Sequence, residues 1–394
     1  MSSENFDYVL DDSSTWPPKQ RPIHPFGPTI VEIIRSCPLR SCFDVSPGYE
    51  RRTSVSGRIG TALHATIQYL GESSFGEKSI EEVAAEASKR FTIELKSQRT
   101  NASERPREQG LSWDNNRLER SAEAAVAEAH RMFQSGNQHT FHTHRSIDYS
   151  DVKGINAANQ IFPLFSQDVS VAVEVPVRSA DGLFKGRVDR AEHTQAGTRL
   201  IDYKSAIRED LPERYERQLQ LYSFMWHDTF GDWPVEAQVY YPLRGAFFSV
   251  DVTPSVCQDV ASDAALLVDK LTKGDQPSTL ATPGDVCKVC EFRPWCRPFW
   301  NSQAKEQKHM RALEKAGIGF EGAIESINLE KHYWRLSIAW RNAKVKFIAP
   351  QERFPHLINA HIGQIIRVTD APLRGQLYEP SAHVSEYTEI FLLK

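Results

Sequence analysis

Two short segments near the middle of the chain constrain its fold most strongly. They are Gly186-Arg187-Val188-Asp189 and Leu200-Ile201-Asp202-Tyr203-Lys204-Ser205, joined through the turn sequence Gln195-Ala196-Gly197-Thr198. Both segments have the alternating pattern of β-strands, and the glycine between them can adopt a positive φ. A two- or four-residue loop centred on Ala196 and Gly197 places Asp189 opposite Lys204. Because side chains alternate across a strand, Asp189, Asp202 and Lys204 then share one face, whereas a three-residue loop would separate them.

Such a face has a defined chemistry. Two adjacent carboxylates repel each other, and a bound cation keeps both of them ionised. Oxygen ligands suit Mg²⁺ or Mn²⁺, which support phosphate chemistry, and a neighbouring lysine can contact a scissile phosphate. The alternative is an ordinary surface hairpin whose Asp202 and Lys204 form an ion pair.

Several further motifs accompany the hairpin in a fixed order. They are Cys37-Pro38, Gly60-Thr61-Ala62-Leu63-His64, Gln218-Leu219-Gln220-Leu221-Tyr222, and Cys287-x-x-Cys290-x5-Cys296. With these motifs the chain resembles the PD-(D/E)XK nuclease superfamily over residues 29–300. Within it, the likeness is to the RecB-type branch with an iron–sulfur cluster, which includes CRISPR-adaptation and AddB-type exonucleases.

The resemblance implies an α/β (α+β) fold with a restriction-endonuclease-like core. It also implies one or two Mg²⁺ or Mn²⁺ ions, with the ligands His64, Asp189, Asp202 and the backbone carbonyl of Tyr203. The catalytic residues that it implies are Asp189, Asp202, Lys204, Gln218 and Tyr222. Lys204 would stabilise charge that develops during phosphodiester hydrolysis. Gln218 and Tyr222 would stand over the active site, since residues four apart share a helix face.

The cysteines form a second group of candidate ligands. By the same resemblance, Cys37, Cys287, Cys290 and Cys296 hold a 4Fe-4S cluster that staples the N-terminal segment to the end of the nuclease region. Cys42 competes with Cys37 for the first position, and the Cys-Pro match favours Cys37. Four thiolates can also hold zinc, which remains the alternative.

Composition limits the function classes. The chain has 394 residues, a formal net charge of −4 and six cysteines, so any nucleic-acid contact must come from local basic patches. We expect a cytoplasmic or nucleoid-associated protein without a membrane association, because no apolar run is long enough to span a bilayer. No Gly-x4-Gly-Lys-Ser/Thr phosphate loop is present, so a helicase or other nucleic-acid-processing partner would be a separate subunit.

Four regions are predicted along the chain. They are an extended or disordered leader (1–28), the iron–sulfur nuclease domain with a helical insertion (29–300), a helical linker (301–319) and a small β-domain (320–394). In the insertion, 79–99 and 116–134 read as amphipathic helices, and the polar stretch between them reads as a loop. Glu174, on a predicted strand at 169–177, either contacts a second metal or bonds to Arg187 or Lys185.

The C-terminal region shows five short strands with a helical segment between the third and fourth. This is the order of an OB-fold barrel, which often binds single strands. Exposed side chains there would stack on bases and follow phosphates, and the candidates are Trp334, Arg335, Trp340, Arg341, Lys344 and Lys346. Alternatively, the aromatic side chains fill a small core or dock on the nuclease domain.

Taken together, the sequence predicts a metal-dependent phosphodiesterase. We expect a deoxyribonuclease, an exonuclease acting on single-stranded DNA or DNA ends, in repair, recombination or defence. The rival hypothesis is a non-catalytic DNA-binding or assembly subunit of a helicase–nuclease or CRISPR-adaptation-like complex.

Overall fold

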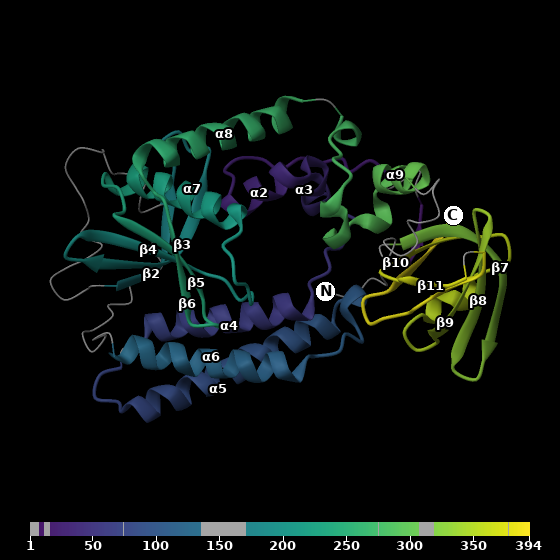
Figure 1. The fold of residues 1–394 in the computed structure, drawn as a ribbon, viewed down its shortest axis with the longest axis horizontal. Coiled ribbons are helices and arrows are strands. Elements are labelled where there is room, and N and C mark those ends of the chain that lie inside the picture. Colours follow the sequence, from purple (N-terminus) through teal and green to yellow (C-terminus); the bar gives the residue numbers. More distant parts are fainter. Residues whose placement is uncertain are drawn as a thin grey trace.

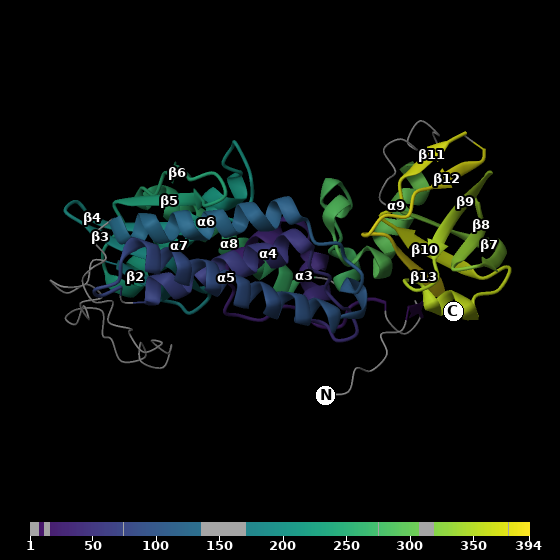
Figure 2. The ribbon, with the colours of Figure 1, turned by 90° about the horizontal axis from the view of Figure 1, so that it is seen from below.

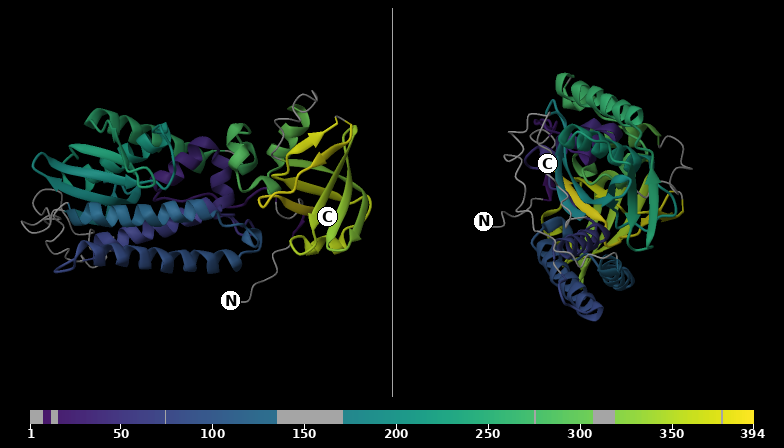
Figure 3. Two further views of the ribbon diagram at one scale, coloured as in Figure 1. Left: turned by 60° about the horizontal axis from the view of Figure 1, so that its bottom comes forward. Right: turned by 90° about the vertical axis from the view of Figure 1, so that its left-hand side faces the viewer.

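The molecule is elongated, with one β-sheet near each end (Figures 1 and 3). The computed structural model describes residues 8–11, 16–73, 75–134, 171–274, 276–306, 319–376 and 378–394. The predicted leader and linker therefore lie partly outside the described residues. One sheet lies within residues 171–250, and the other is formed by strands between residues 319 and 393 together with a short strand near the N-terminus.

The first sheet has five strands in the order β2-β3-β4-β5-β6. Their bounds are β2 Val171–Arg178, β3 Lys185–Thr194, β4 Gly197–Tyr203, β5 Glu236–Tyr241 and β6 Ala246–Val250. Neighbours pair antiparallel, except β4 and β5, which run parallel. The parallel step requires a crossover between β4 and β5, and a helix provides it.

Helices cover both faces of this sheet (Figures 1 and 2). On one side lie α2 (Pro28–Ser36), α7 (Glu213–Phe230) and α8 (Pro254–Lys273), with α3 (Pro38–Val45) next to α2. On the other side lie α4 (Val55–Glu72), α5 (Ile80–Ser103) and α6 (Asn115–Gln134). The two predicted insertion helices correspond to α5 and α6, whereas α8 lies in a stretch for which we predicted no element. None of the described helices is long and apolar enough to cross a membrane.

Each face of the sheet has its own apolar core. The core under α7 and α8 includes Val239, Leu219 and Trp226, all almost completely buried. The core between the sheet and the α4–α6 layer includes Ile67 and Ile201. Burial of apolar side chains on both faces fixes the sheet between two helical layers.

Helix α4 approaches the end of β4 very closely. Ser54 caps the helix by accepting a hydrogen bond from the backbone N–H of Gly57. A Cβ atom at Gly60 would lie only 2.1 Å from Oγ of Ser205. The glycine of the Gly-Thr-Ala-Leu-His motif is therefore needed where the helix meets the segment that follows β4, and this contact brings His64 towards that strand.

The C-terminal sheet has eight strands in the order β1-β13-β10-β7-β8-β9-β12-β11. Their bounds are β1 Val9–Leu10, β7 Gly319–Glu330, β8 Tyr333–Trp340, β9 Ala343–Pro350, β10 Ile365–Thr369, β11 Leu373–Gly375, β12 Pro380–Ala382 and β13 Glu389–Leu393. A 3₁₀ turn, η7 (Pro355–Asn359), lies between β9 and β10, as predicted for the helical segment. Among the described strands β1 and β11 are the edges, so no closed barrel is seen. Part of the predicted leader is ordered, because β1 pairs with β13.

Of the two alternatives for the tryptophans of this region, the structure supports the core position for Trp334 and Trp340. Trp334 and Trp340 are 4% and 6% exposed and belong to the core of the C-terminal sheet. Side chains alternate across a strand, and both residues fall on the inner face of β8. Arg335 lies on the opposite, outer face and is exposed.

Buried ion pairs join the C-terminal sheet to the rest of the molecule. Arg107, in the turn between α5 and α6, donates to both carboxylate oxygens of Glu389 at 2.7 and 2.8 Å. Arg293, beside the cysteines, donates to Asp370 at 2.8 Å, and Arg52 donates to the same carboxylate at 3.1 Å. The polar stretch that we predicted as a loop thus contains a buried arginine, Arg107. It is buried because its partner Glu389, near the other end of the chain, packs against it in the fold.

The Arg107–Glu389 pair generates a stability prediction. Arg107→Met should lower the free energy of unfolding by about 3–5 kcal/mol, because it leaves a buried carboxylate without its main partner. Arg208→Ala, which removes an exposed arginine paired with Asp210, is the control and should barely change the melting temperature. Urea unfolding followed by circular dichroism measures both, and equal stability of the two variants would show that the buried pair is not a structural link.

Candidate active site

The β3–β4 ladder ends at the predicted site. Its last paired residues are Arg190 and Ile201, and the strands are joined by the two-residue loop 195–196. This register extends to place Asp189 opposite Asp202, so the predicted pairing of Asp189 with Lys204 is wrong by two residues. The shift preserves the parity of the hairpin, and the shared face is retained. Beyond the ladder, Oδ2 of Asp189 accepts a hydrogen bond from the backbone N–H of Tyr203 at 2.7 Å.

Three ligand-type side chains converge beside this point. Nε2 of His64 lies 3.3 Å from Oε1 of Glu174 and 3.6 Å from Oδ1 of Asp189. One ligand atom from each of these three side chains lies within 4.8 Å of the other two. A helix and two strands supply these side chains, so the fold itself assembles the group.

Glu174 has an unusual backbone. Its φ is +52°, in the middle of β2, where the pairing with β3 skips from Val173 to Val175. A non-glycine residue with positive φ inside a strand costs free energy and tends to mark a functional site. Its backbone carbonyl accepts from Arg187 at 3.2 Å, while its carboxylate bonds to His64.

Asp202 and Lys204 form the other half of the site. Nζ of Lys204 lies 2.8 Å from Oδ2 of Asp202 and 4.9 Å from the centre of the Tyr215 ring. Asp202 is buried, at 5% exposure. The charge of Asp202 also raises the pKa of Asp189 and of His64. The four side chains are therefore close enough to affect one another's protonation.

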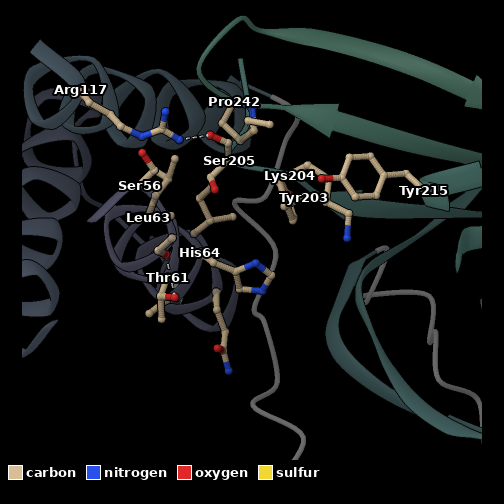
Figure 4. Close-up of a pocket in the computed structure, with 16 residues that line it drawn as sticks. Ser56, Thr61, Leu63, His64, Arg117, Tyr203, Lys204, Ser205, Tyr215 and Pro242 are labelled. Atoms are coloured by element: carbon tan, nitrogen blue, oxygen red, sulfur yellow. Dashed lines mark hydrogen bonds between the residues drawn. The ribbon is translucent and has the colours of Figure 1, made fainter. Parts of the chain in front are cut away.

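A cleft of about 520 Å³ opens beside these residues (Figure 4). Its lining includes His64 from α4, Tyr203 and Lys204 from the end of β4, Tyr215 from α7 and Arg117 from α6. Figure 4 shows the imidazole of His64 extending from α4 on the side where β4 ends. A substrate in the cleft can therefore contact the helical insertion and the catalytic motif together.

The site places the carboxylates of Glu174, Asp189 and Asp202 beside the imidazole of His64 and the ammonium group of Lys204. Burial and the charge of Asp202 raise the pKa of Asp189 to about 7. Burial alone would lower the pKa of His64, but its hydrogen bond to Glu174 and the nearby carboxylates raise it to about 9. Burial alone would also lower the pKa of Lys204, but the charges of Asp202 and Asp189 raise it overall. Lys204 therefore stays protonated. Protons occupy positions that a divalent cation could take.

Four predicted residues are not part of the cleft lining: Asp189 and Asp202, which lie beside it, and Gln218 and Tyr222 on α7. Gln218 is buried on α7, and the ring of Tyr222 packs against Gly186, whose Cβ would lie 2.6 Å from the ring. Tyr215 reaches the cleft instead; it precedes Tyr222 by two helical turns, so the same helical spacing could have identified it. Arg117, which donates to the backbone carbonyl of Ser205 at 2.9 Å, had no sequence signal because it comes from the distant insertion.

The four candidate cluster cysteines gather at the junction with the C-terminal sheet. Cys37, Cys290 and Cys296 contact an apolar cluster that contains Trp295. Burial raises the pKa of Cys296, and the nearby Cys290, Cys37 and Cys287 raise it further. Burial similarly raises the pKa of Cys290 to about 12.

Cys42 lies in a different environment. It is completely buried in the core under α7 and α8, and not in the aromatic cluster that surrounds Cys37. Burial raises the pKa of its thiol to about 11. The structure therefore places Cys37, rather than Cys42, beside the distal cysteines.

Comparison with known families agrees with this arrangement. The model of the PD-(D/E)XK nuclease superfamily matches residues 25–297, more than half of the chain. The chain belongs to this superfamily of metal-dependent nucleases, and phosphodiester cleavage is the activity that membership implies. The expected superfamily is thus confirmed.

Solved structures show weaker likenesses. The solution structure of a replication factor A related protein from Methanobacterium thermoautotrophicum is 18% identical, with a TM-score of 0.16, and covers 20% of this chain and 82% of that protein. The crystal structure of SSO0001 is 13% identical, with a TM-score of 0.22, and covers 55% of this chain and 95% of that protein. A search of curated protein sequences gives no match.

Metal binding at this site should depend on pH in a defined direction. A cation must displace the protons held by His64, whose pKa is about 9, and by Asp189, whose pKa is about 7. Affinity for Mn²⁺ should therefore rise with pH, by up to about tenfold per pH unit for each displaced proton. Calorimetric titration between about pH 6 and pH 9 measures this rise. Asp189→Asn should bind Mn²⁺ much more weakly across this range because it removes a ligand, and an affinity of the unaltered protein that is independent of pH would contradict the assignment.

Proposed function

We propose that the protein is a metal-dependent deoxyribonuclease that acts as an exonuclease on single-stranded DNA or DNA ends. The observation that carries the proposal is the convergence of His64, Asp189, Asp202 and Lys204 at the end of the β3–β4 ladder, beside a cleft. Membership of the nuclease superfamily supports the chemistry. The open cleft is compatible with entry of a flexible strand, and this motivates the preference for single strands or ends.

The donor set fits Mg²⁺ or Mn²⁺. His64, Asp189 and Asp202 would hold one or two ions together with the backbone carbonyl of Tyr203, and Glu174 lies where it can join them. Oxygen-rich sites with one imidazole suit these cations. When bound, such an ion polarises the phosphoryl group and lowers the pKa of water, which supplies the nucleophile for hydrolysis.

Lys204 has a separate role in this proposal. Its ammonium group is protonated, half-buried and fixed by Asp202 and the face of Tyr215. A fixed cation at this place can stabilise charge as it develops on a phosphate. Gln218 and Tyr222 are proposed to support the site from α7, and the packing of Tyr222 against Gly186 suggests that it acts through the position of β3.

The cysteines are proposed to bind a 4Fe-4S cluster. All four thiols lie close enough to influence one another, and aromatic side chains shelter them. The buried aromatic surroundings suit an iron–sulfur cluster, whose reduction potential depends on its exposure to solvent.

The C-terminal sheet is proposed to be an OB-like barrel with an interrupted fifth strand. Strands β7, β8 and β9 form a meander, and β10 pairs with β7. The last segment pairs twice: β12 lies parallel to β9, and β13 lies antiparallel to β10. Residues 383–388 separate these two pairings, so a single chain segment connects the two sides of the sheet.

A second candidate function is a non-catalytic subunit in a helicase–nuclease or CRISPR-adaptation-like assembly. The grouping of His64, Glu174 and Asp189, with Asp202 and Lys204 beside them, favours the nuclease. In either case a separate helicase or processing subunit is a proposed partner, and an intracellular location would keep the thiols reduced. DNA repair, recombination or defence is the proposed setting.

Substitution of the paired residues tests the activity. Asp202→Ala should abolish cleavage of an end-labelled oligonucleotide in Mg²⁺ or Mn²⁺, because it removes a ligand and the partner of Lys204. Lys204→Ala should reduce the rate by about 10²-fold or more while metal binding persists. Asp210→Ala, an exposed carboxylate, is the control and should cleave at the normal rate. Normal cleavage by both site variants, with contaminating nuclease excluded, would refute the proposed site.

A different experiment tests the cluster. Cys290→Ser should lose iron and the broad absorption near ~400 nm that is typical of iron–sulfur proteins. It should also become protease-sensitive, because the cluster would join segments that lie far apart in sequence. Cys257→Ser provides the control: Cys257 is buried in the other core, so its substitution should leave iron content unchanged. An iron-free but stably folded Cys290→Ser protein would show that no cluster is needed as a staple.

A further inference from the structure

A second cleft lies on the C-terminal sheet, far along the chain from the nuclease motifs. It has a volume of about 810 Å³ and is lined mainly by β7, β8 and β9. Its walls include Tyr333 and Arg335 on β8, Lys344, Lys346 and Ile348 on β9, and His383 after β12. We call this the outer groove. None of its lining residues belongs to the nuclease site.

The outer face of the sheet is covered at one side and open at the other. On β13 and β10, Phe391 packs against Trp295, and Arg367 donates to the carbonyl of Pro294 at 3.0 Å. These contacts bury that part of the face under the cysteine segment. Across the sheet, Tyr333 and Ile348 are 51% and 47% exposed in the described structure. An aromatic ring and a branched apolar side chain are thus presented at the outer groove.

Each cation in the outer groove is paired with a carboxylate that is not itself among the lining residues. Its lining contains the cations Arg335, Lys344 and Lys346, and it contains no carboxylate among the described lining residues. Their ion-pair partners, Glu330, Glu325 and Glu379, are not part of that lining. These pairs are solvent-exposed and therefore weak, so an anion in the groove can compete for the cations.

The order of the side chains suits an extended polyanion. Lys344 and Lys346 are two residues apart on β9, about 7 Å along the strand, a spacing that successive phosphates of an extended nucleic-acid strand can match. Arg335 on β8 lies opposite Ile348 on β9, and Tyr333 lies opposite Pro350, two residues further along the strands. Along β8 and β9 the cations Lys344, Lys346 and Arg335 therefore come first, and the ring of Tyr333 follows at the end.

We propose that the outer groove binds single-stranded nucleic acid at a site distinct from the cleavage cleft. Tyr333 stacks on an unpaired base, while Arg335, Lys344 and Lys346 contact phosphates. A duplex hides its base faces, so this pattern selects single strands. The groove does not depend on the nuclease activity, because its residues neither hold the metal nor line the cleavage cleft.

Fluorescence anisotropy of the full-length protein with a labelled oligothymidylate tests the proposal. EDTA is included, so cleavage does not occur and metal-assisted binding at the nuclease site is removed. Tyr333→Ala should weaken binding by about tenfold, and Tyr333→Phe should bind normally because it keeps the ring. The double variant Arg335→Ala/Lys346→Ala should weaken binding and flatten its salt dependence.

Lys273→Ala is the matched control, since Lys273 is also an exposed lysine in a surface ion pair. It should bind oligothymidylate as the unaltered protein does. A photo-cross-linking experiment with 5-iodouracil in the same oligonucleotide gives a second readout. The cross-link should map to the peptide that contains Tyr333.

Two results would overturn the proposal. The first is normal binding by the Tyr333→Ala and double variants together with cross-links confined to other peptides. The second is competition by a hexaglutamate peptide that binds as tightly as the oligonucleotide and with the same dependence on Tyr333, which would identify an acidic-peptide site. Cleavage by the unaltered protein in Mg²⁺ is measured separately, so failure of this proposal is distinguishable from failure of the proposed nuclease function.

Discussion

Crowding of carboxylates at the end of one hairpin is the constraint on which the site depends. The β3–β4 ladder stops at Arg190 and Ile201, and the side chain of Asp189 replaces it as acceptor for the Tyr203 N–H. Asp202 follows immediately on the neighbouring strand, and Glu174 reaches the same place from β2. Carboxylates held this close in a partly buried site require a compensating positive charge. His64 and Lys204 supply part of it, and a divalent cation would complete it.

The surrounding layers hold this arrangement in place. Helix α4 carries His64 and approaches the strand end at Gly60, where a larger residue would collide with Ser205. Helix α7 packs on the other face and brings Tyr215 over Lys204. Near the cysteines, Arg293 joins their segment to the C-terminal sheet through Asp370. The nuclease core, the cysteine segment and the C-terminal sheet are therefore structurally linked, although their chemistry is separate.

Local patterns predicted much of this structure. Strand alternation and the motif order identified Asp189, Asp202 and Lys204 as neighbours, and the two-residue error in register did no harm because it preserved their parity. Features that depend on distant partners could not be predicted. Arg107 was predicted to be part of a polar loop, because its contact with Glu389 forms only in the folded protein. Arg117 was not predicted as a cleft residue, because it comes from the helical insertion, far in sequence from Ser205. For Trp334 both an exposed and a core position were open, because alternation alone does not reveal which face of a strand is buried.

Anomalous diffraction from a crystal soaked with Mn²⁺ tests the central claim most directly, because it locates the ion without relying on activity. The ligand geometry predicts a peak at the manganese absorption edge within coordination distance of His64 and Asp189, on the side of Asp202 or Glu174. Loss of that peak in Asp189→Asn crystals would be the matching result. An empty site at saturating Mn²⁺, with ordered side chains and peaks only elsewhere, would contradict the assignment of this cluster as the metal centre.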